Sequence, residues 1–201
     1  MEAKRLTAKK TSNTEISKGK FVKKLGFESS YVLTDLGRRL SRVRVLGLIV
    51  DKFISQDEKY ATLTLDDGKD TLRLKSFVNV KIFNGLEPGA LVDVFGKVKE
   101  YNGEIYVTPE ILKKVDANFE TLRALELKEI KIDQLKKIKL VEDQKNNTSD
   151  INELEKALKN IVSREDIESI IEADEILITD TEEVAEKSVH NKEKILELIG
   201  K

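Results

Sequence analysis

Apolar and polar residues alternate through the middle of this chain, between Arg42 and Thr108. An alternation of period two puts successive side chains on opposite faces of a β-strand. The pattern predicts five strands, over residues 42–50, 60–65, 71–77, 90–99 and 105–108. A parallel sheet would need a crossover helix between successive strands, and no such helical pattern separates them.

Glycines and one Asp-Gly pair predict how these strands bend and connect to form a closed barrel. Gly47 interrupts the first strand and Gly96 the fourth, and a glycine inside a strand indicates a bulge or a sharp bend. Asp67 and Gly68 predict a hairpin between the second and third strands. The connection over residues 78–89 is long enough to plug one end of a barrel. Together these features predict an OB-fold, a five-stranded Greek-key barrel.

The segments around the barrel predict a mainly β protein with α extensions. Residues 1–20 contain almost no apolar side chains, so we expect a flexible basic arm that cannot offset the entropy of ordering. Apolar residues from Phe21 to Leu33 predict a segment that packs on the outside of the barrel. This segment belongs with the barrel in one domain, residues 21–115.

Beyond the barrel the apolar period becomes helical. Phe119, Leu122 and Leu125 recur at intervals of three, which predicts a helix over residues 116–141 with an apolar stripe that an isolated helix would not leave in water. A polar linker follows over residues 142–149.

Residues 150–201 predict a small acidic helical tail. Helix caps are expected at Asp150 and at the pair Ser163 and Asp166. Ile176–Ile178 have the pattern of a short strand, and Lys192–Ile199 that of a last helix. The pattern allows either a folded helical subdomain or a loose segment.

Composition excludes several classes of protein. The 201 residues contain no cysteine and one histidine, His190, which excludes disulfides, thiolate metal sites and multi-histidine clusters. No apolar run approaches the roughly 20 residues of a membrane span, and the basic start lacks the apolar stretch of a signal peptide. We expect a soluble cytoplasmic protein with no cofactor and no metal.

The net charge of −1 hides a gradient along the chain. Residues 1–52 hold 13 Lys and Arg against 5 Asp and Glu, whereas residues 148–201 hold 7 against 15. A basic head can lie near phosphates. A solvated surface is the commoner explanation of an acidic tail, and recruitment of protein partners is the alternative.

Outward positions of the predicted barrel combine cations with aromatic rings. Proteins that bind single strands use a basic groove that follows the phosphates and rings on which bases stack. In OB-folds the first and last loops flank the binding cleft. The candidate nucleic-acid-binding residues are Lys52, Phe53, Tyr60, Arg73, Lys75, Phe77, Phe95, Lys97, Lys99 and Tyr101.

A structural interpretation competes with this functional one. An antiparallel sheet with one solvated face alternates polar residues in any case, and Phe77 and Phe95 would then pack beneath residues 21–33 or the following helix. Either an extended phosphate path or a solvated strand explains a second basic cluster: Arg38, Arg39, Arg42 and Arg44.

Catalysis has little support in the sequence. A hairpin turn explains the acidic residues Asp66, Asp67 and Asp70 without a metal. No phosphate loop of the glycine, lysine, serine type is present, and no nucleophile stands in a histidine-bearing arrangement. We therefore expect no enzyme activity.

Several short motifs occur in a fixed order between residues 27 and 127. They are Tyr31–Thr34, Arg42–Gly47, Leu65–Gly68, Val92–Val98, Tyr101–Tyr106, Pro109–Glu110 and Asn118–Arg123. In this order they resemble the archaeal replication protein A family, and its middle-sized subunit in particular. Single pieces recur in many OB-folds, so the resemblance depends on their combination.

The resemblance implies a subunit of a heterotrimeric complex that binds single-stranded DNA in replication, recombination and repair. The helix after the barrel would bundle with other subunits, with Phe119, Leu122 and Leu125 in that interface. Two alternatives remain open. One is an assembly adaptor that holds a larger single-strand-binding subunit and contacts DNA weakly, and the other is an anticodon-type RNA-binding OB module.

Overall fold

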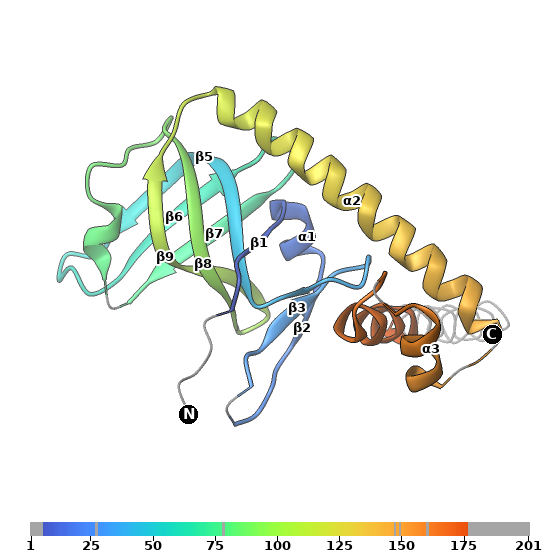
Figure 1. The fold of residues 1–201 in the computed structure, drawn as a ribbon. Coiled ribbons are helices and arrows are strands. Elements are labelled where there is room, and N and C mark those ends of the chain that lie inside the picture. Colours follow the sequence, from blue (N-terminus) through green and yellow to red (C-terminus); the bar gives the residue numbers. More distant parts are fainter. Residues whose placement is uncertain are drawn as a thin grey trace, which may run out of the picture.

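The computed structural model describes residues 6–26, 28–77, 79–146, 148, 150–159 and 161–176. A barrel lies beside a small sheet, and one long helix leads from the barrel to a group of C-terminal helices (Figure 1). The single histidine, His190, and the predicted last helix, Lys192–Ile199, lie outside the described residues.

Five strands form the barrel, as the alternation predicted. They are β5 (Arg42–Ile54), β6 (Ala61–Asp66), β7 (Thr71–Ser76), β8 (Leu91–Tyr101) and β9 (Glu104–Lys114). The pairs β5–β6, β6–β7, β8–β9 and β5–β8 are antiparallel, and β7 meets β9 in parallel. Because β5 pairs with both β6 and β8, the sheet closes on itself.

β5 bends and serves both halves of the barrel. Its residues 42–48 pair with β8, and its residues 48–54 pair with β6. A register shift leaves Val50 as the extra residue of a bulge. A Cβ atom on Gly47 would lie 3.0 Å from the Asp66 carbonyl oxygen, so the glycine lets the strands approach closely at the bend.

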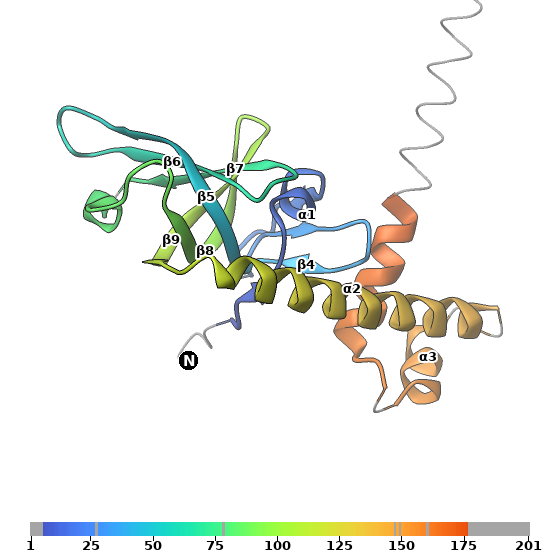
Figure 2. The ribbon, with the colours of Figure 1, turned by 90° about the horizontal axis from the view of Figure 1, so that it is seen from above.

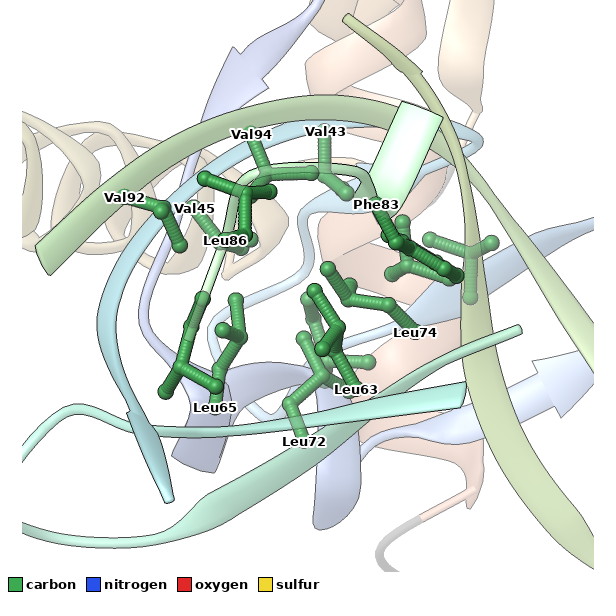
Figure 3. Close-up of a cluster of buried hydrophobic side chains, with 14 of the residues drawn as sticks. Val43, Val45, Leu63, Leu65, Leu72, Leu74, Phe83, Leu86, Val92 and Val94 are labelled. Carbon is green, nitrogen blue, oxygen red and sulfur yellow. The ribbon is translucent and has the colours of Figure 1, made fainter. Parts of the chain in front are cut away.

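Inward side chains fill the barrel. Every residue that the alternation turned inward is buried: Val43, Val45, Ala61, Leu63, Leu65, Leu72, Leu74, Val92, Val94 and Val98. The connection between β7 and β8 contains a 3-10 helix, η1 (Val80–Phe83), and both Phe83 and Leu86 reach the core (Figure 3). The predicted plug is confirmed.

The last strand is longer than the sequence pattern predicted. β9 continues through Pro109 to Lys114, whereas the pattern ended it before that proline. A register shift in the ladder pairs Gly96 with Pro109 and Phe95 with Ile111. Proline is tolerated at such a bulge, where the ladder is already interrupted.

The prediction of a flexible arm is wrong for the described part of residues 1–20. β1 (Lys9–Lys10) pairs in parallel with β5, and α1 (Asn13–Ser17) follows. Ser12 and Glu15 form a capping box that fixes the start of α1. Ile16 is fully buried in the barrel core. One apolar anchor and a local cap therefore order a segment whose composition is otherwise polar.

A second antiparallel sheet follows α1. It consists of β2 (Lys20–Val22), β3 (Tyr31–Leu33) and β4 (Arg39–Leu40). Val32 and Leu40 are buried in the same cluster as the barrel core. The expectation that this segment packs on the barrel is confirmed, although its strands were not readable from the sequence.

α2 (Asn118–Lys145) begins soon after β9 and extends past the predicted end, into the expected linker (Figure 2). Polar groups anchor it to the barrel. The buried Arg123 guanidinium lies 3.0 Å from the buried Asp93 carboxylate and also donates to the Arg44 carbonyl oxygen. Further along, the Gln134 amide donates to the Leu36 carbonyl oxygen.

The described part of the acidic tail is folded. α3 (Ile151–Ala157) and a helix over residues 164–176 follow α2, and Figure 2 shows the second of them crossing α2. The predicted caps are confirmed, since Asp150 and Ser163 each accept a hydrogen bond from a backbone nitrogen of the following turn. Ile176 is helical, so the predicted strand is wrong at that residue. A second core joins the helices: Val141, Leu154, Leu158, Val162, Ile167 and Ile170.

The helix over residues 164–176 also contacts the small sheet. Tyr31 is buried against Ala173, and its hydroxyl lies 2.8 Å from a Glu172 carboxylate oxygen. Arg39 lies 2.8 Å from the same carboxylate. Burial, followed by the hydrogen bond to Glu172, raises the pKa of Tyr31 to about 12. The sheet and the tail are therefore joined by apolar and charged contacts.

Candidate nucleic-acid interface

Neighbouring strands assemble one outward surface of the barrel. Phe53 on β5 pairs with Thr62 on β6, which pairs with Lys75 on β7. The Lys75 ammonium lies 4.8 Å from the ring centroid of Tyr106 on β9, and Tyr106 pairs with Lys99 on β8. We name this surface the aromatic face. It comprises Phe53, Tyr60, Thr62, Arg73, Lys75, Phe77, Lys99, Tyr101, Glu104 and Tyr106.

Three adjoining rings form one end of the aromatic face. The centroids of Phe53 and Tyr60 lie 6.4 Å apart, and those of Tyr60 and Phe77 lie 4.9 Å apart. Phe53 is 54% exposed and Phe77 is 57% exposed. The structural interpretation required Phe77 to be covered by residues 21–33 or by the following helix. The exposure of Phe77 contradicts that interpretation. Rings exposed in this way offer surfaces on which bases can stack.

The β5–β6 hairpin positions two of these rings. The Ser55 nitrogen donates to the Tyr60 carbonyl oxygen at 2.8 Å, and the Ser55 hydroxyl accepts from the Tyr60 nitrogen at 3.0 Å. The turn over residues 55–60 is thereby closed. Figure 2 shows this hairpin projecting beyond the barrel, on the side away from the C-terminal helices.

Two cations of the aromatic face are already paired with a carboxylate. Lys75 Nζ lies 2.6 Å from Glu104 Oε2, and an Arg73 guanidinium nitrogen lies 3.2 Å from Glu104 Oε1. The hydrogen bond from Lys75, with added attraction to both cations, lowers the pKa of Glu104. Lys75 is only 8% exposed. The prediction that it stands open to solvent is wrong, because Glu104 and Tyr106 cover it.

The β8–β9 hairpin carries two further predicted residues. Asn102 and Gly103 have φ values of 52° and 79°, as in the two-residue turns that suit the twist of a hairpin. Tyr101 is 67% exposed beside this turn, and Lys99 is exposed as well. Both residues are accessible next to Glu104, as the sequence predicted.

Phe95 lies apart from the aromatic face. It pairs with Arg44 on β5 and with Ile111 on β9, and the Arg44 guanidinium lies 4.8 Å from its ring centroid. The ring is half-buried. Sequence reasoning grouped Phe95 with Phe77 as if the sheet were flat, and closure of the barrel separates their outward directions.

Two predicted cations also lie elsewhere. Lys97 is exposed but pairs with Arg42, away from β6 and β7. Lys52 pairs with the inward residue Leu63, and its ammonium donates to the Leu86 carbonyl oxygen at 2.7 Å. Lys52 therefore closes the end of the barrel and does not join the aromatic face.

The second basic cluster is neither an open phosphate path nor a solvated strand. Each guanidinium pairs with a carboxylate from another element. The pairs are Arg38–Glu15, Arg39–Glu172, Arg42–Glu110 and Arg44–Asp93, at 2.9, 2.8, 2.6 and 2.5 Å. These ion pairs join α1, the tail helix and the strands of the barrel to one another.

The residues predicted for a subunit interface are exposed on α2 and form a band that winds around the helix, because steps of three residues fall short of one full turn. We name it the α2 stripe, and its side chains are 37% to 62% exposed: Phe119, Leu122, Leu125, Ile132 and Leu135. Residues seven apart, such as Leu125 and Ile132, share a helix face. The buried residues of α2, which include Arg123 and Gln134, occupy the other side.

Sequence reasoning missed Glu104 and Tyr106 as residues of the aromatic face. Both were noted only as parts of a turn and of a closing strand. On β9, Glu104 pairs with Tyr101 and Tyr106 pairs with Lys99. Because paired residues share a face of the sheet, the outward direction of Tyr101 and Lys99 could have placed both residues outward.

The described residues give no indication of a metal centre or a membrane span. Among them, no group of three or more His, Asp or Glu side chains could hold a metal ion. Within the same part of the chain, no helix is both long and apolar enough to cross a bilayer.

Comparison with known proteins identifies the barrel. The model of a family named tRNA anti-codon and described as OB-fold nucleic acid binding domain matches residues 43–115. The barrel is an OB-fold. The predicted fold, a mainly β OB-fold core with helical extensions, is therefore confirmed.

Relatives and solved structures are similar over parts of the chain. An uncharacterized protein of Methanocaldococcus jannaschii is 30% identical over 113 residues, which cover 56% of this chain and 46% of that protein. The chain thus spans less than half the length of that relative.

Two solved structures are similar at lower identity. Yeast RPA bound to ssDNA has 20% identity and a TM-score of 0.49, covering 64% of this chain and 92% of that chain. The S. pombe Stn1–Ten1 complex has 23% identity and a TM-score of 0.46, covering 50% and 78%. At these identities the likeness concerns the fold alone.

Proposed function

We propose that this chain is a non-enzymatic, cytoplasmic subunit of a replication protein A-like complex. It binds single-stranded DNA with little sequence specificity and acts in replication, recombination and repair. The observation that supports this proposal most is the cluster of exposed rings formed by Phe53, Tyr60 and Phe77 on an OB-fold barrel.

Stacking and charge act together on the aromatic face. Every base has a flat face, so stacking on a ring tolerates any sequence and contributes about 1–3 kcal/mol per base. Lys99 and Arg73 are exposed, and each lies within four residues of Tyr101 or Phe77 along the chain. These two cations would contact the phosphates. Phosphate contacts make affinity fall as salt rises. We therefore expect non-specific, salt-sensitive binding.

The test replaces single rings. Phe53→Ala and Phe77→Ala should each weaken binding of fluorescent oligo-dT by about 1–3 kcal/mol, because each removes one stacking surface. Both side chains are exposed, so the thermal unfolding midpoint should stay near that of the wild type. Fluorescence anisotropy at a fixed salt concentration measures the affinity.

Phe95→Ala is the matched control. It removes the same kind of ring from an outward position of the barrel that lies outside the aromatic face. We expect affinity close to that of the wild type. The proposal is wrong if Phe53→Ala and Phe77→Ala both bind oligo-dT like the wild type.

We propose other subunits of the complex as the protein partners, with the α2 stripe as the contact surface. The stripe exposes five large apolar side chains on one helix, and exposed apolar groups of this kind mark sites of association. An adaptor role remains the alternative. It predicts that the isolated chain shifts a labelled single strand only after its partner is added.

An RNA-binding module is the second candidate function. The name of the matching family, tRNA anti-codon, favours this candidate. Competition between matched DNA and RNA oligomers for the same labelled strand decides between the two. Our proposal expects the DNA oligomer to compete at least as well as the RNA oligomer.

A further inference from the structure

Glu104 places a negative charge in the middle of a surface that would receive a negatively charged strand. We propose that its carboxylate acts as an internal substitute for a backbone phosphate. It competes with nucleic acid for Arg73 and Lys75, and so it lowers affinity for the strand. This inference rests on the single-strand binding proposed above.

The carboxylate bridges two cations as a phosphate would. One oxygen lies 2.6 Å from the Lys75 ammonium, and the other lies 3.2 Å from the Arg73 guanidinium. Carboxylate and phosphate oxygens are both charged acceptors that suit Arg and Lys donors. The Tyr106 ring contacts the ammonium at 4.8 Å. The Lys75 ammonium is therefore fixed in a position that binds an anion, and the Glu104 carboxylate is the anion bound there.

The position of the pair matches the expected path of the strand. Arg73 and Lys75 alternate along the outward side of β7, and the exposed Phe77 follows directly after the end of that strand. Tyr101 is exposed on the neighbouring hairpin. A strand whose bases stack on Phe77 and on Tyr101 would carry its phosphates past Glu104.

Glu104 can leave without disturbing the core. It is the first residue of β9, and its side chain is 40% exposed. The turn before it is closed independently, because the Gly103 nitrogen donates to the Glu100 carboxylate. Rotation of the Glu104 side chain into solvent therefore frees both cations from their carboxylate partner while the hairpin keeps its shape.

Glu104→Gln tests the inference because it keeps the shape of the side chain and removes its charge. The variant should bind oligo-dT more tightly at low salt, by roughly fivefold, as expected for one unfavourable contact between charges at the surface. The plot of log affinity against log salt should steepen by about 0.7 for each additional phosphate that the variant binds. A purely structural ion pair would not change this slope.

Two comparisons make the test specific. Glu129→Gln removes the same charge from an exposed position on α2, and it should leave affinity and slope unchanged. In an Arg73→Gln, Lys75→Gln background, Glu104→Gln should have no effect, because the groups for which it competes are absent.

The outcomes separate the inference from the function on which it rests. If the wild type binds oligo-dT and Glu104→Gln binds equally or more weakly with the same slope, the competition is disproved and the proposed function stands. If the wild type binds no single strand, both fail. An equal increase in affinity for Glu104→Gln and Glu129→Gln also overturns the inference, because net charge alone then explains it.

Discussion

Gly37 illustrates how much a single position can decide. Its φ is +66°, and a Cβ atom there would lie 2.6 Å from the Cα atom of Ile170. Two requirements therefore meet at one residue, a left-handed turn and the close approach of a helix from the acidic tail. Only glycine satisfies both without strain.

Gly37→Ala should destabilise the protein by more than the turn conformation alone would cost. Strain at a positive φ costs about 1–3 kcal/mol, and the clash with Ile170 adds to it. The matched control is Gly103→Ala, where φ is +79° and nothing lies within 4 Å of the added Cβ. Urea unfolding measures the loss of unfolding free energy in both variants. Equal losses would show that the tail helix moves aside freely.

The two phenylalanines that looked alike in the sequence differ because of their neighbours. Both Phe77 and Phe95 stand at outward positions of their strands. Phe77 lies beside the Tyr60 ring and is 57% exposed, whereas the half-buried Phe95 lies under the guanidinium of Arg44. Outward direction follows from alternation, but exposure depends on what other strands place nearby.

At the scale of elements, the N-terminal segment shows how tertiary contacts order a polar stretch. α1 has five residues, too few to be stable alone. Its Ile16 is buried in the barrel core, and Arg38 pairs with Glu15 at 2.9 Å. The segment is thus part of the folded domain.

Ile16→Ala should therefore cost about 2–5 kcal/mol of unfolding free energy, as for other large-to-small changes in a core. Leu25→Ala is the control, since Leu25 is 86% exposed and its loss should stay within about 0.5 kcal/mol. Chemical denaturation followed by circular dichroism compares them. A small loss in Ile16→Ala would mean that α1 merely rests on the barrel.

α2 is attached to the barrel through polar groups, and this explains why the apolar residues of the α2 stripe remain exposed. The buried pair of Arg123 and Asp93 and the bond from Gln134 to the Leu36 carbonyl hold one side of the helix. The opposite side has no role in that attachment. The α2 stripe is therefore left accessible, as the proposed subunit interface requires.

At the scale of the whole molecule, the two proposed surfaces lie on different elements, the aromatic face on the barrel strands and the α2 stripe on the helix that follows them. The β5–β6 hairpin, which carries part of the aromatic face, projects on one side, and α2 leads away to the other (Figures 1 and 2). Binding of a strand and assembly with other subunits would then use separate residues. We therefore expect that substitutions can remove either proposed function while the other remains.

Replacement of Leu125 and Ile132 by Glu tests this separation. We expect loss of co-purification with partner subunits from the protein's own cells, because charges on an apolar surface oppose burial. Oligo-dT affinity of the isolated chain should stay at the wild-type level. Phe77→Ala should weaken oligo-dT binding and leave co-purification with the partner subunits unchanged.

Lys131→Glu serves as the control for charge, since it is exposed on α2 beside the stripe. We expect this variant to co-purify with the partner subunits as the wild type does. The interface assignment fails if the double variant assembles normally.

The charge gradient along the chain is partly neutralised within the molecule. Lys9 pairs with Glu165 at 3.3 Å, and Arg39 lies within 4 Å of both Glu168 and Glu172. Some cations of the basic head are therefore bound to acids of the tail. The two ends do not each require a separate external partner, as the gradient by itself suggested.

The barrel could be predicted from the sequence alone. Period-two alternation assigned the inward residues correctly, and Asp67 with Gly68 marked the β6–β7 hairpin. These features were readable because side-chain alternation and turn geometry depend on residues close together in the chain. The helix caps at Asp150 and Ser163 were predicted for the same reason.

Which of the outward residues form one surface depends on the closed fold and could not be predicted from the sequence. Closure of the barrel separated Phe95 and Lys97 from Phe77, turned Lys52 inward, and brought Glu104 onto Lys75 and Arg73. It also ordered the N-terminal segment through Ile16. These outcomes depend on contacts between residues distant in the chain, and alternation within one strand carries no information about them.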